Sequence, residues 1–195
     1  NIAAILEKHG IETEWLDAVC LMADQTAAAP LHGDTTLSSL PAARRKAEMG
    51  FVMHFDRLEL GRLKNHLAAA GLPEACTAAA ERLDFPTLQG FLNGFIDLTC
   101  LLPDGTACII DYKSNHLGMD TGSYTQSALD QAVADHHYHL QAWIYALAAA
   151  RHLKQRGQMP RTVRIRYLFL RGLDSGGRNG IWSWDIPTTS LAEWL

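Results

Sequence analysis

The alternation of hydrophobic and polar residues along the chain predicts a mixed α/β fold. Apolar positions recur at helical spacing over residues 2–29, with a break at Gly10, and over residues 56–80, where Gly71 and Pro73 interrupt them. A third and longer helix is predicted over residues 124–156. Apolar runs typical of strands cover residues 46–55, 94–102, 107–113, 163–171 and 181–186, and loops are predicted at 31–40, 114–123 and 174–180. This order favours helices packed around one mixed sheet.

The central hairpin turns through a Pro-Asp-Gly-Thr segment and can be paired in two ways. A two-residue Asp-Gly loop places Asp97 and Asp111 on opposite faces of the hairpin. A three-residue Pro-Asp-Gly loop, with Gly105 in the left-handed conformation, places them directly opposite each other, about 4.5–5.5 Å apart at Cβ. Strand alternation then puts Lys113 on the same face. We favour the three-residue loop because it alone brings these polar side chains together.

Two carboxylates and a lysine on one face suit metal-dependent cleavage of a phosphodiester. Asp97 and Asp111 supply the oxygen ligands that a divalent cation prefers, and the Lys113 ammonium can stabilise the attacking oxygen or the developing charge. Both acids lie within strongly apolar strands, where an unpaired charge is expensive. A purely structural ion pair between Asp111 and Lys113 explains the same residues about as well.

The opposite face of the hairpin is predicted to be core. Its residues are Ile96, Leu98, Cys100, Leu102, Cys108 and Ile110. The favoured register makes Cys100 and Cys108 cross-strand neighbours, which we expect to be buried, reduced thiols in a cytoplasmic protein. The four cysteines form no C-x-x-C pair, so neither zinc nor a cysteine-ligated cluster is expected.

The predicted helix at 124–156 carries a second group of polar residues. Tyr138, Gln141 and Tyr145 fall on one stripe, which is either the edge of the core or a set of side chains that point into a cleft and contact phosphate or base. His136, His137 and His139 cluster at the start of this stripe. Because adjacent histidines point in different directions on a helix, we expect solvated or phosphate-contacting side chains here rather than a metal site.

Charge and composition set limits on the partners. The 195 residues carry a formal net charge of −4 with histidine neutral, so no overall basic field indicates autonomous binding to nucleic acid. A partner could instead deliver the substrate. The sequence contains no signal peptide and no apolar run of membrane length, and it looks excised from a longer protein.

Five blocks of the sequence resemble a known family. In chain order they are G-F-I-D-L, I-I-D-Y-K-S-N-H-L-G, Y-T-Q-S-A-L, H-Y-H-L-Q-A-W-I-Y and Y-L-F-L-R-G. Their order and spacing are similar to the C-terminal nuclease domain of the RecB family, the β subunits of bacterial exodeoxyribonuclease V (RecBCD). The resemblance covers most of the chain and implies the restriction-endonuclease-like PD-(D/E)xK fold, an α/β mixed sheet flanked by helices. We expect residues 1–195 to form one nuclease domain, with a helical part at 1–45 and a nuclease core at 46–195.

The resemblance also assigns roles to residues. Asp97 takes the first acidic motif, Asp111 and Lys113 the D-x-K motif, and Gln141 and Tyr145 the Q-x-x-x-Y motif. It implies Mg²⁺ as the cofactor.

A wider set of residues would support this centre. The backbone carbonyl of Tyr112 would be a third metal ligand, and Tyr138, Asn115 and Glu48 would support the site or contact DNA. By this alignment, a further metal-ligating histidine of the family lies before Asn1, and His54 does not match it. One ligand is therefore expected to be missing, which would leave the isolated fragment inactive.

The resemblance implies hydrolysis of DNA during double-strand break repair and recombination. The substrate would be single strands delivered by a helicase, and the partners would be the RecC and RecD subunits. The alternative is a catalytically silent, nuclease-like module that serves as a docking surface, for example for the recombinase RecA. The presence of Asp97, Asp111 and Lys113 together argues against a silent module, because a docking surface does not need them.

Overall fold

The computed structural model describes residues 2–177 and 179–195, which form helices on both sides of one principal sheet. The helices are α1 (Ile2–Lys8), α2 (Leu16–Ala28), α3 (Leu60–Ala69), α4 (Glu74–Glu81), α5 (Gln126–Asp135) and α6 (Tyr138–Gln155). The strands are β1 (Pro30–His32), β2 (Thr35–Thr36), β3 (Arg45–Leu58), β4 (Leu88–Leu101), β5 (Ala107–Lys113), β6 (Thr162–Phe169) and β7 (Ile181–Pro187). Short 3₁₀ turns lie at Thr13–Trp15, Ala42–Arg44, Thr121–Ser123 and Thr188–Trp194. No helix in the described ranges is long and apolar enough to cross a membrane.

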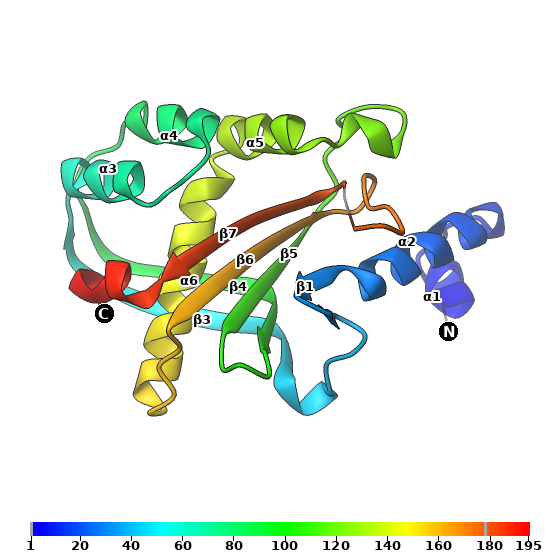
Figure 1. The fold of residues 1–195 in the computed structure, drawn as a ribbon, viewed down its shortest axis with the longest axis horizontal. Helices are drawn as coiled ribbons and strands as arrows, with labels where there is room; N and C mark the ends of the chain where they lie inside the picture. Colours follow the sequence, from blue (N-terminus) through cyan, green and yellow to red (C-terminus); the bar gives the residue numbers. More distant parts are fainter. Residues whose placement is uncertain (1, 178) are drawn as a thin grey trace.

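The principal sheet has the strand order β3-β4-β5-β6-β7 (Figure 1). All neighbours are antiparallel except β5 and β6, which run parallel. The chain crosses between these two parallel strands through α5 and α6, and α6 packs across one face of the sheet (Figure 1). The α/β mixed sheet expected from the sequence is confirmed. The segment expected to be a loop at 31–40 additionally forms the small β1–β2 ladder.

The hairpin pairs in the favoured register. Leu98 lies opposite Ile110 and Cys100 opposite Cys108, and the N–H of Leu102 donates to the carbonyl of Thr106 at 2.9 Å. Gly105 has φ +82°, which is the left-handed conformation that the three-residue loop requires. Both cysteines are buried and free, as expected.

Two hydrophobic clusters fill the two sides of the sheet. The larger lies between the sheet and α3–α6, with Trp143 and Trp182 fully buried at its centre. The smaller lies between the sheet and residues 29–40, and it contains Leu98, Cys100, Leu102, Cys108 and Ile110. The prediction was wrong for Ile96, which packs in the larger cluster on the other face.

The reason is an interruption of strand alternation at Glu48 and Asp97. Ala47 pairs with Leu98 and Met49 with Ile96, so Glu48 falls opposite Asp97 in the same register. Leu98 packs in the smaller cluster, whereas Met49 and Ile96 pack in the larger one. Glu48 has φ +48°, a conformation that L-residues rarely adopt. The β3–β4 ribbon therefore exchanges its faces at the position of Asp97.

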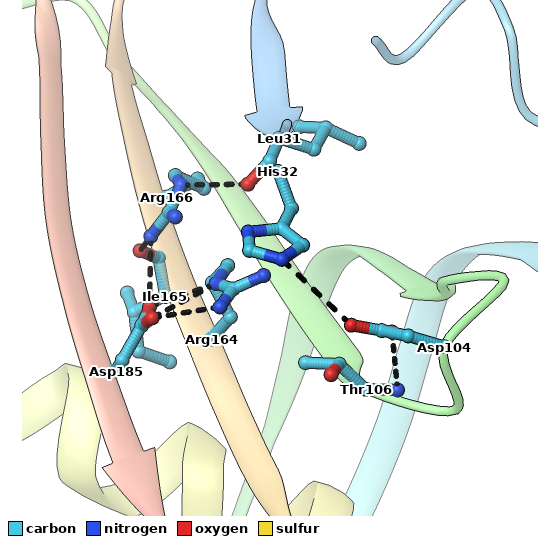
Figure 2. A network of polar contacts seen from close by, with 8 residues as sticks. All are labelled: Leu31, His32, Asp104, Thr106, Arg164, Ile165, Arg166 and Asp185. Atoms are coloured by element: carbon cyan, nitrogen blue, oxygen red, sulfur yellow. Dashed lines mark hydrogen bonds and ion pairs between the residues drawn. The ribbon is translucent and has the colours of Figure 1, made fainter. Parts of the chain in front are cut away.

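A polar network attaches the N-terminal segment to the sheet (Figure 2). Arg164 donates two hydrogen bonds to Asp185 Oδ2, at 3.0 and 2.8 Å, and Arg166 donates to Asp185 Oδ1 and to the carbonyl of Leu31, both at 3.2 Å. Burial alone would raise the pKa of Asp185, but the two guanidinium groups hold it below its ordinary value. The bond to Leu31 links β6 to the strand that covers this face.

The helix predicted over residues 124–156 is broken into α5 and α6. His137 adopts the left-handed conformation with φ +53°, which ends one helix and starts the next. His136 and His137 are exposed, but His139 is fully buried, so the prediction of a solvated or phosphate-contacting side chain was wrong for His139. Burial lowers the pKa of His139 to about 4.

Replacing Glu48 by glycine should stabilise the fold. Glycine relieves the left-handed strain at this exposed position, and we expect a gain of about 0.5–1 kcal/mol in the free energy of unfolding, measured by urea denaturation. The matched control is Ala47→Gly one residue earlier, which should destabilise because it loosens an ordinary strand position. Equal losses in both variants would contradict the strain argument.

Stability should fall in acid because of His139. The folded state lowers the pKa of His139 from 6.5 to about 4, so the unfolded chain binds the proton more readily. The stabilisation is complete above about pH 6.5 and is lost as the pH falls towards 4, with a slope of up to about 1.4 kcal/mol per pH unit from this group. His139→Leu should flatten the slope seen in urea titrations between these pH values. An unchanged slope would contradict the prediction.

A control variant and the contribution of a second histidine help to interpret that experiment. The exposed His9→Leu variant should keep the wild-type slope. Part of the slope should survive in His139→Leu, because burial also lowers the pKa of His66.

Candidate active site

The centre of the candidate site is the buried ammonium of Lys113. Lys113 Nζ lies 2.6 Å from Asp111 Oδ2 and donates a 2.7 Å hydrogen bond to Gln141 Oε1. It also lies 3.7 Å from the ring centre of Tyr138 and 4.6 Å from that of Tyr167. Asp111 and Lys113 are only 5% and 6% exposed, so β5, α6 and β6 together enclose this charge.

The lysine also determines how Gln141 is oriented. An ammonium group only donates hydrogen bonds, so the amide oxygen of Gln141 must face Lys113 and its NH₂ group must face away. That NH₂ group donates to the hydroxyl of Tyr145 at 3.1 Å. The Tyr145 hydroxyl therefore acts as an acceptor here and still has its own proton to donate. The structure thus brings together the polar residues of one α6 stripe and the lysine of β5.

Asp97 joins this group by ending the β4–β5 ladder. The last backbone pair is Leu98 with Ile110, and the next N–H of β5 in this ladder, that of Tyr112, donates to Asp97 Oδ2 at 3.0 Å. A side-chain oxygen thus replaces the next backbone acceptor. Because the N–H and C=O of one strand residue point to the same edge, the Tyr112 carbonyl also points towards β4 and Asp97.

The electrostatics of the site reflect burial and the closeness of the two acids. Burial raises the pKa of Asp111 above its ordinary value and Asp97 raises it further, while the Lys113 ammonium opposes both effects. Burial and the same two carboxylates raise the pKa of Tyr145 to about 12. Tyr145 therefore remains a protonated hydrogen-bond donor at neutral pH.

Most residues proposed from the sequence meet in this network, but Glu48 does not. The Tyr138 hydroxyl donates to Asn115 Oδ1 at 3.4 Å, which connects α6 to the loop after β5. Glu48 is exposed and makes no hydrogen bond or ion pair with the described residues of the site, although it lies opposite Asp97 in the β3–β4 register. A supporting role for Glu48 at the site therefore stays a prediction.

Two tyrosines that sequence reasoning missed also hold the site together. Tyr167 pairs with Asp111 across the parallel β5–β6 ladder, and its hydroxyl donates to the Tyr138 carbonyl at 3.0 Å. Tyr124 is fully buried; its hydroxyl donates to the Asn115 carbonyl at 3.1 Å and accepts from the N–H of Leu117 at 3.2 Å. Strand alternation could have placed Tyr167 on the correct face, but only the strand order reveals Asp111 as its neighbour.

The oxygen atoms available here fit a magnesium ion. Asp97 and Asp111 each use Oδ2 in the contacts given above, and among the described residues the Oδ1 atom of neither acid takes part in a hydrogen bond or ion pair. The described residues contain no cluster of three or more His, Cys, Asp or Glu side chains suited to a metal. Mg²⁺ is commonly held by only one or two carboxylates, with waters and substrate phosphates completing its shell. Two carboxylates and the Tyr112 carbonyl are compatible with that pattern.

Comparison with known proteins assigns this geometry to a family. A sequence profile described as the PD-(D/E)XK nuclease superfamily matches residues 15–182, which include the whole network. The RecBCD enzyme subunit RecB of Escherichia coli (strain K12) is 33% identical over 174 residues, which are 87% of this chain and 14% of that protein. The corresponding subunit of Buchnera aphidicola subsp. Acyrthosiphon pisum is 25% identical over 196 residues, or 98% of this chain and 16% of that protein.

A third relative extends the similarity to another bacterial lineage. The RecBCD enzyme subunit RecB of Mycolicibacterium smegmatis is 29% identical over 209 residues, which cover 91% of this chain and 19% of that protein. The chain spans less than a fifth of the length of each of these three relatives. The fold, the network around Lys113 and these matches agree: the chain belongs to the PD-(D/E)XK nuclease superfamily and is a RecB-like nuclease domain.

Proposed function

We propose that this chain is a Mg²⁺-dependent DNA nuclease of the exodeoxyribonuclease V type. It would hydrolyse phosphodiester bonds in recombination repair as part of a RecB-like subunit that works with RecC- and RecD-like partners. The observation that supports this most strongly is the buried Lys113 ammonium, held between Asp111 and Gln141 next to Asp97. Burying such a charge is costly, and a structural role alone does not require it.

The chain's own residues would divide the work as follows. Asp97, Asp111 and the Tyr112 carbonyl would hold Mg²⁺, which supplies Lewis-acid polarisation of the phosphoryl oxygen. Lys113 has three N–H donors, of which Asp111 and Gln141 use two, so one remains for the attacking water or a phosphate oxygen.

The helix α6 would position these groups. Gln141 fixes the ammonium in place, and the Tyr145 hydroxyl, which keeps its proton, would donate to a phosphate oxygen. Preorganised donors of this kind stabilise charge that develops in the transition state without reorganising during the reaction.

Removing the charge of Asp111 tests the proposal. In the full-length subunit, Asp111→Asn should lower Mg²⁺-dependent degradation of single-stranded DNA by about 10²-fold or more, because one ligand oxygen and one negative charge are lost. Release of acid-soluble nucleotides measures the rate. Asp97→Asn should have a similar effect while it keeps an acceptor for the Tyr112 N–H, and the exposed Asp84→Asn should leave the rate unchanged.

The outcomes separate the nuclease from the docking module. Undiminished degradation in both site variants, with unchanged folding by circular dichroism, would contradict the assignment of Asp97 and Asp111 to a nuclease site. A full-length subunit that neither degrades DNA nor binds Mg²⁺ in calorimetry would favour the silent module, for which RecA is the candidate partner.

The ring of Tyr138 should contribute to the rate by holding Lys113. Tyr138→Leu removes the cation–π contact and should lower the cleavage rate about tenfold, equivalent to about 1.4 kcal/mol. Tyr138→Phe keeps the ring and loses only the hydrogen bond to Asn115, so its rate should stay close to that of the wild type. Equal rates for the Leu and Phe variants would show that the ring does not position the lysine.

A further inference from the structure

A basic groove lies at the end of α6 away from Gln141. It has a volume of about 540 Å³ and is walled by the start of β3, the end of β4 and the last turns of α6. Its cationic or basic lining residues are Arg44, Arg45, Lys46, His152 and Arg156, and its described lining contains no Asp or Glu. This concentration of one sign contrasts with the net charge of −4 of the whole chain.

The cations of this groove are not neutralised by carboxylates. None of the five takes part in an ion pair among the described residues. Among the described side-chain contacts, Arg44 donates hydrogen bonds to the carbonyls of Leu101 and Leu102, at 3.5 and 3.2 Å. Basic residues in the last turn of a helix often complement its dipole, which accounts for His152 but not for Arg44, Arg45 and Lys46, since those three precede or begin β3.

The groove and the candidate active site are both built on β4 and α6. Thr99 lines the groove and pairs with Lys46 across the β3–β4 ladder. Thr99 also lies two residues from Asp97, about 7 Å along the strand. The Lys46–Thr99 row therefore lies two rows from Asp97, with the Ala47–Leu98 pair between them.

Residues of α6 also relate the groove to the candidate active site. His152 follows Tyr145 by seven residues and Arg156 follows it by eleven, so all three lie on one stripe of the helix. A helix rises about 1.5 Å per residue, so the two basic residues lie about 10–16 Å beyond Tyr145 along the helix axis. One strand row and one helix stripe thus lead from the carboxylates to the groove.

We propose that this groove binds the sugar–phosphate backbone of a single DNA strand about 10–16 Å from the phosphodiester that is cut. The inference rests on the proposed nuclease function and adds to it a binding site and a path for the strand. Lys and Arg contacts to phosphates position a nucleic acid without reading its sequence, which suits an enzyme that degrades DNA of any sequence. Delivery by a partner explains the chain's overall negative charge, and the local groove explains how the delivered strand is held.

Binding of a fluorescent oligothymidylate to the 195-residue chain in EDTA tests the groove without cleavage. The variant is Lys46→Ala with Arg156→Ala, two exposed positions, and the control removes two charges elsewhere, Lys8→Ala with Lys154→Ala. We expect the groove variant to bind about tenfold more weakly at about 50 mM salt and the control to match the wild type. The slope of log K against log salt should become shallower by about 1.4, or about 0.7 for each lost phosphate contact.

The results distinguish failure of the groove from failure of the nuclease. Equal affinity and equal salt slope in the groove variant and the control would overturn the proposal that the groove binds DNA. A wild-type chain that does not bind the oligonucleotide at about 50 mM salt would also overturn it. Binding of polyglutamate through the same residues, without DNA binding, would overturn it in favour of an acidic protein partner. Groove-dependent binding together with undiminished cleavage in the Asp97→Asn and Asp111→Asn variants would support the groove and count against the proposed nuclease site.

Discussion

The structure depends on compensating one positive charge inside its core. Lys113 is almost fully buried, and a buried ammonium costs several kcal/mol unless its surroundings replace the lost water. Asp111 provides the countercharge, Gln141 an acceptor, and Tyr138 and Tyr167 the negative faces of their rings. These partners come from β5, β6 and α6. The same contacts therefore position the helix on the parallel strand pair and set the geometry of the site.

The parts of this arrangement that could be predicted are those set by local rules. The turn residues, with Gly105 in the left-handed conformation, determine the hairpin register as far as Leu98 and Ile110, and Asp97 lies close enough to Asp111 to raise its pKa. Helical spacing places Gln141 and Tyr145 on one stripe without any knowledge of what α6 contacts. Both inferences need only a few neighbouring residues, which is why they agree with the structure.

The parts that escaped prediction depend on distant neighbours or on strained residues. The partnership of Tyr167 with Asp111 exists only because β6 returns parallel to β5. The break between α5 and α6 occurs at His137, and neither proline nor glycine marks it in the sequence. Because of this break, the side chain of His139 points into the core. Ile96 packs on the unexpected face because the β3–β4 ribbon exchanges its faces beside Glu48, a left-handed residue on β3. Strand alternation in the sequence gives no sign of this exchange.

The hydrogen bond from the Tyr112 N–H to Asp97 has a consequence for the way relatives of this domain are interpreted. An acceptor at position 97 completes the backbone ladder whether or not the domain cleaves anything, so a lineage that lost catalysis would still be selected to keep Asp or Asn there. The buried Asp111–Lys113 pair has no such protection, because apolar residues can replace a buried ion pair at little cost or with a gain in stability. In a decaying copy of this domain, the first acid would therefore outlast the second acid and its lysine. Retention of that pair, rather than of the first acid, is the informative sign of a working enzyme.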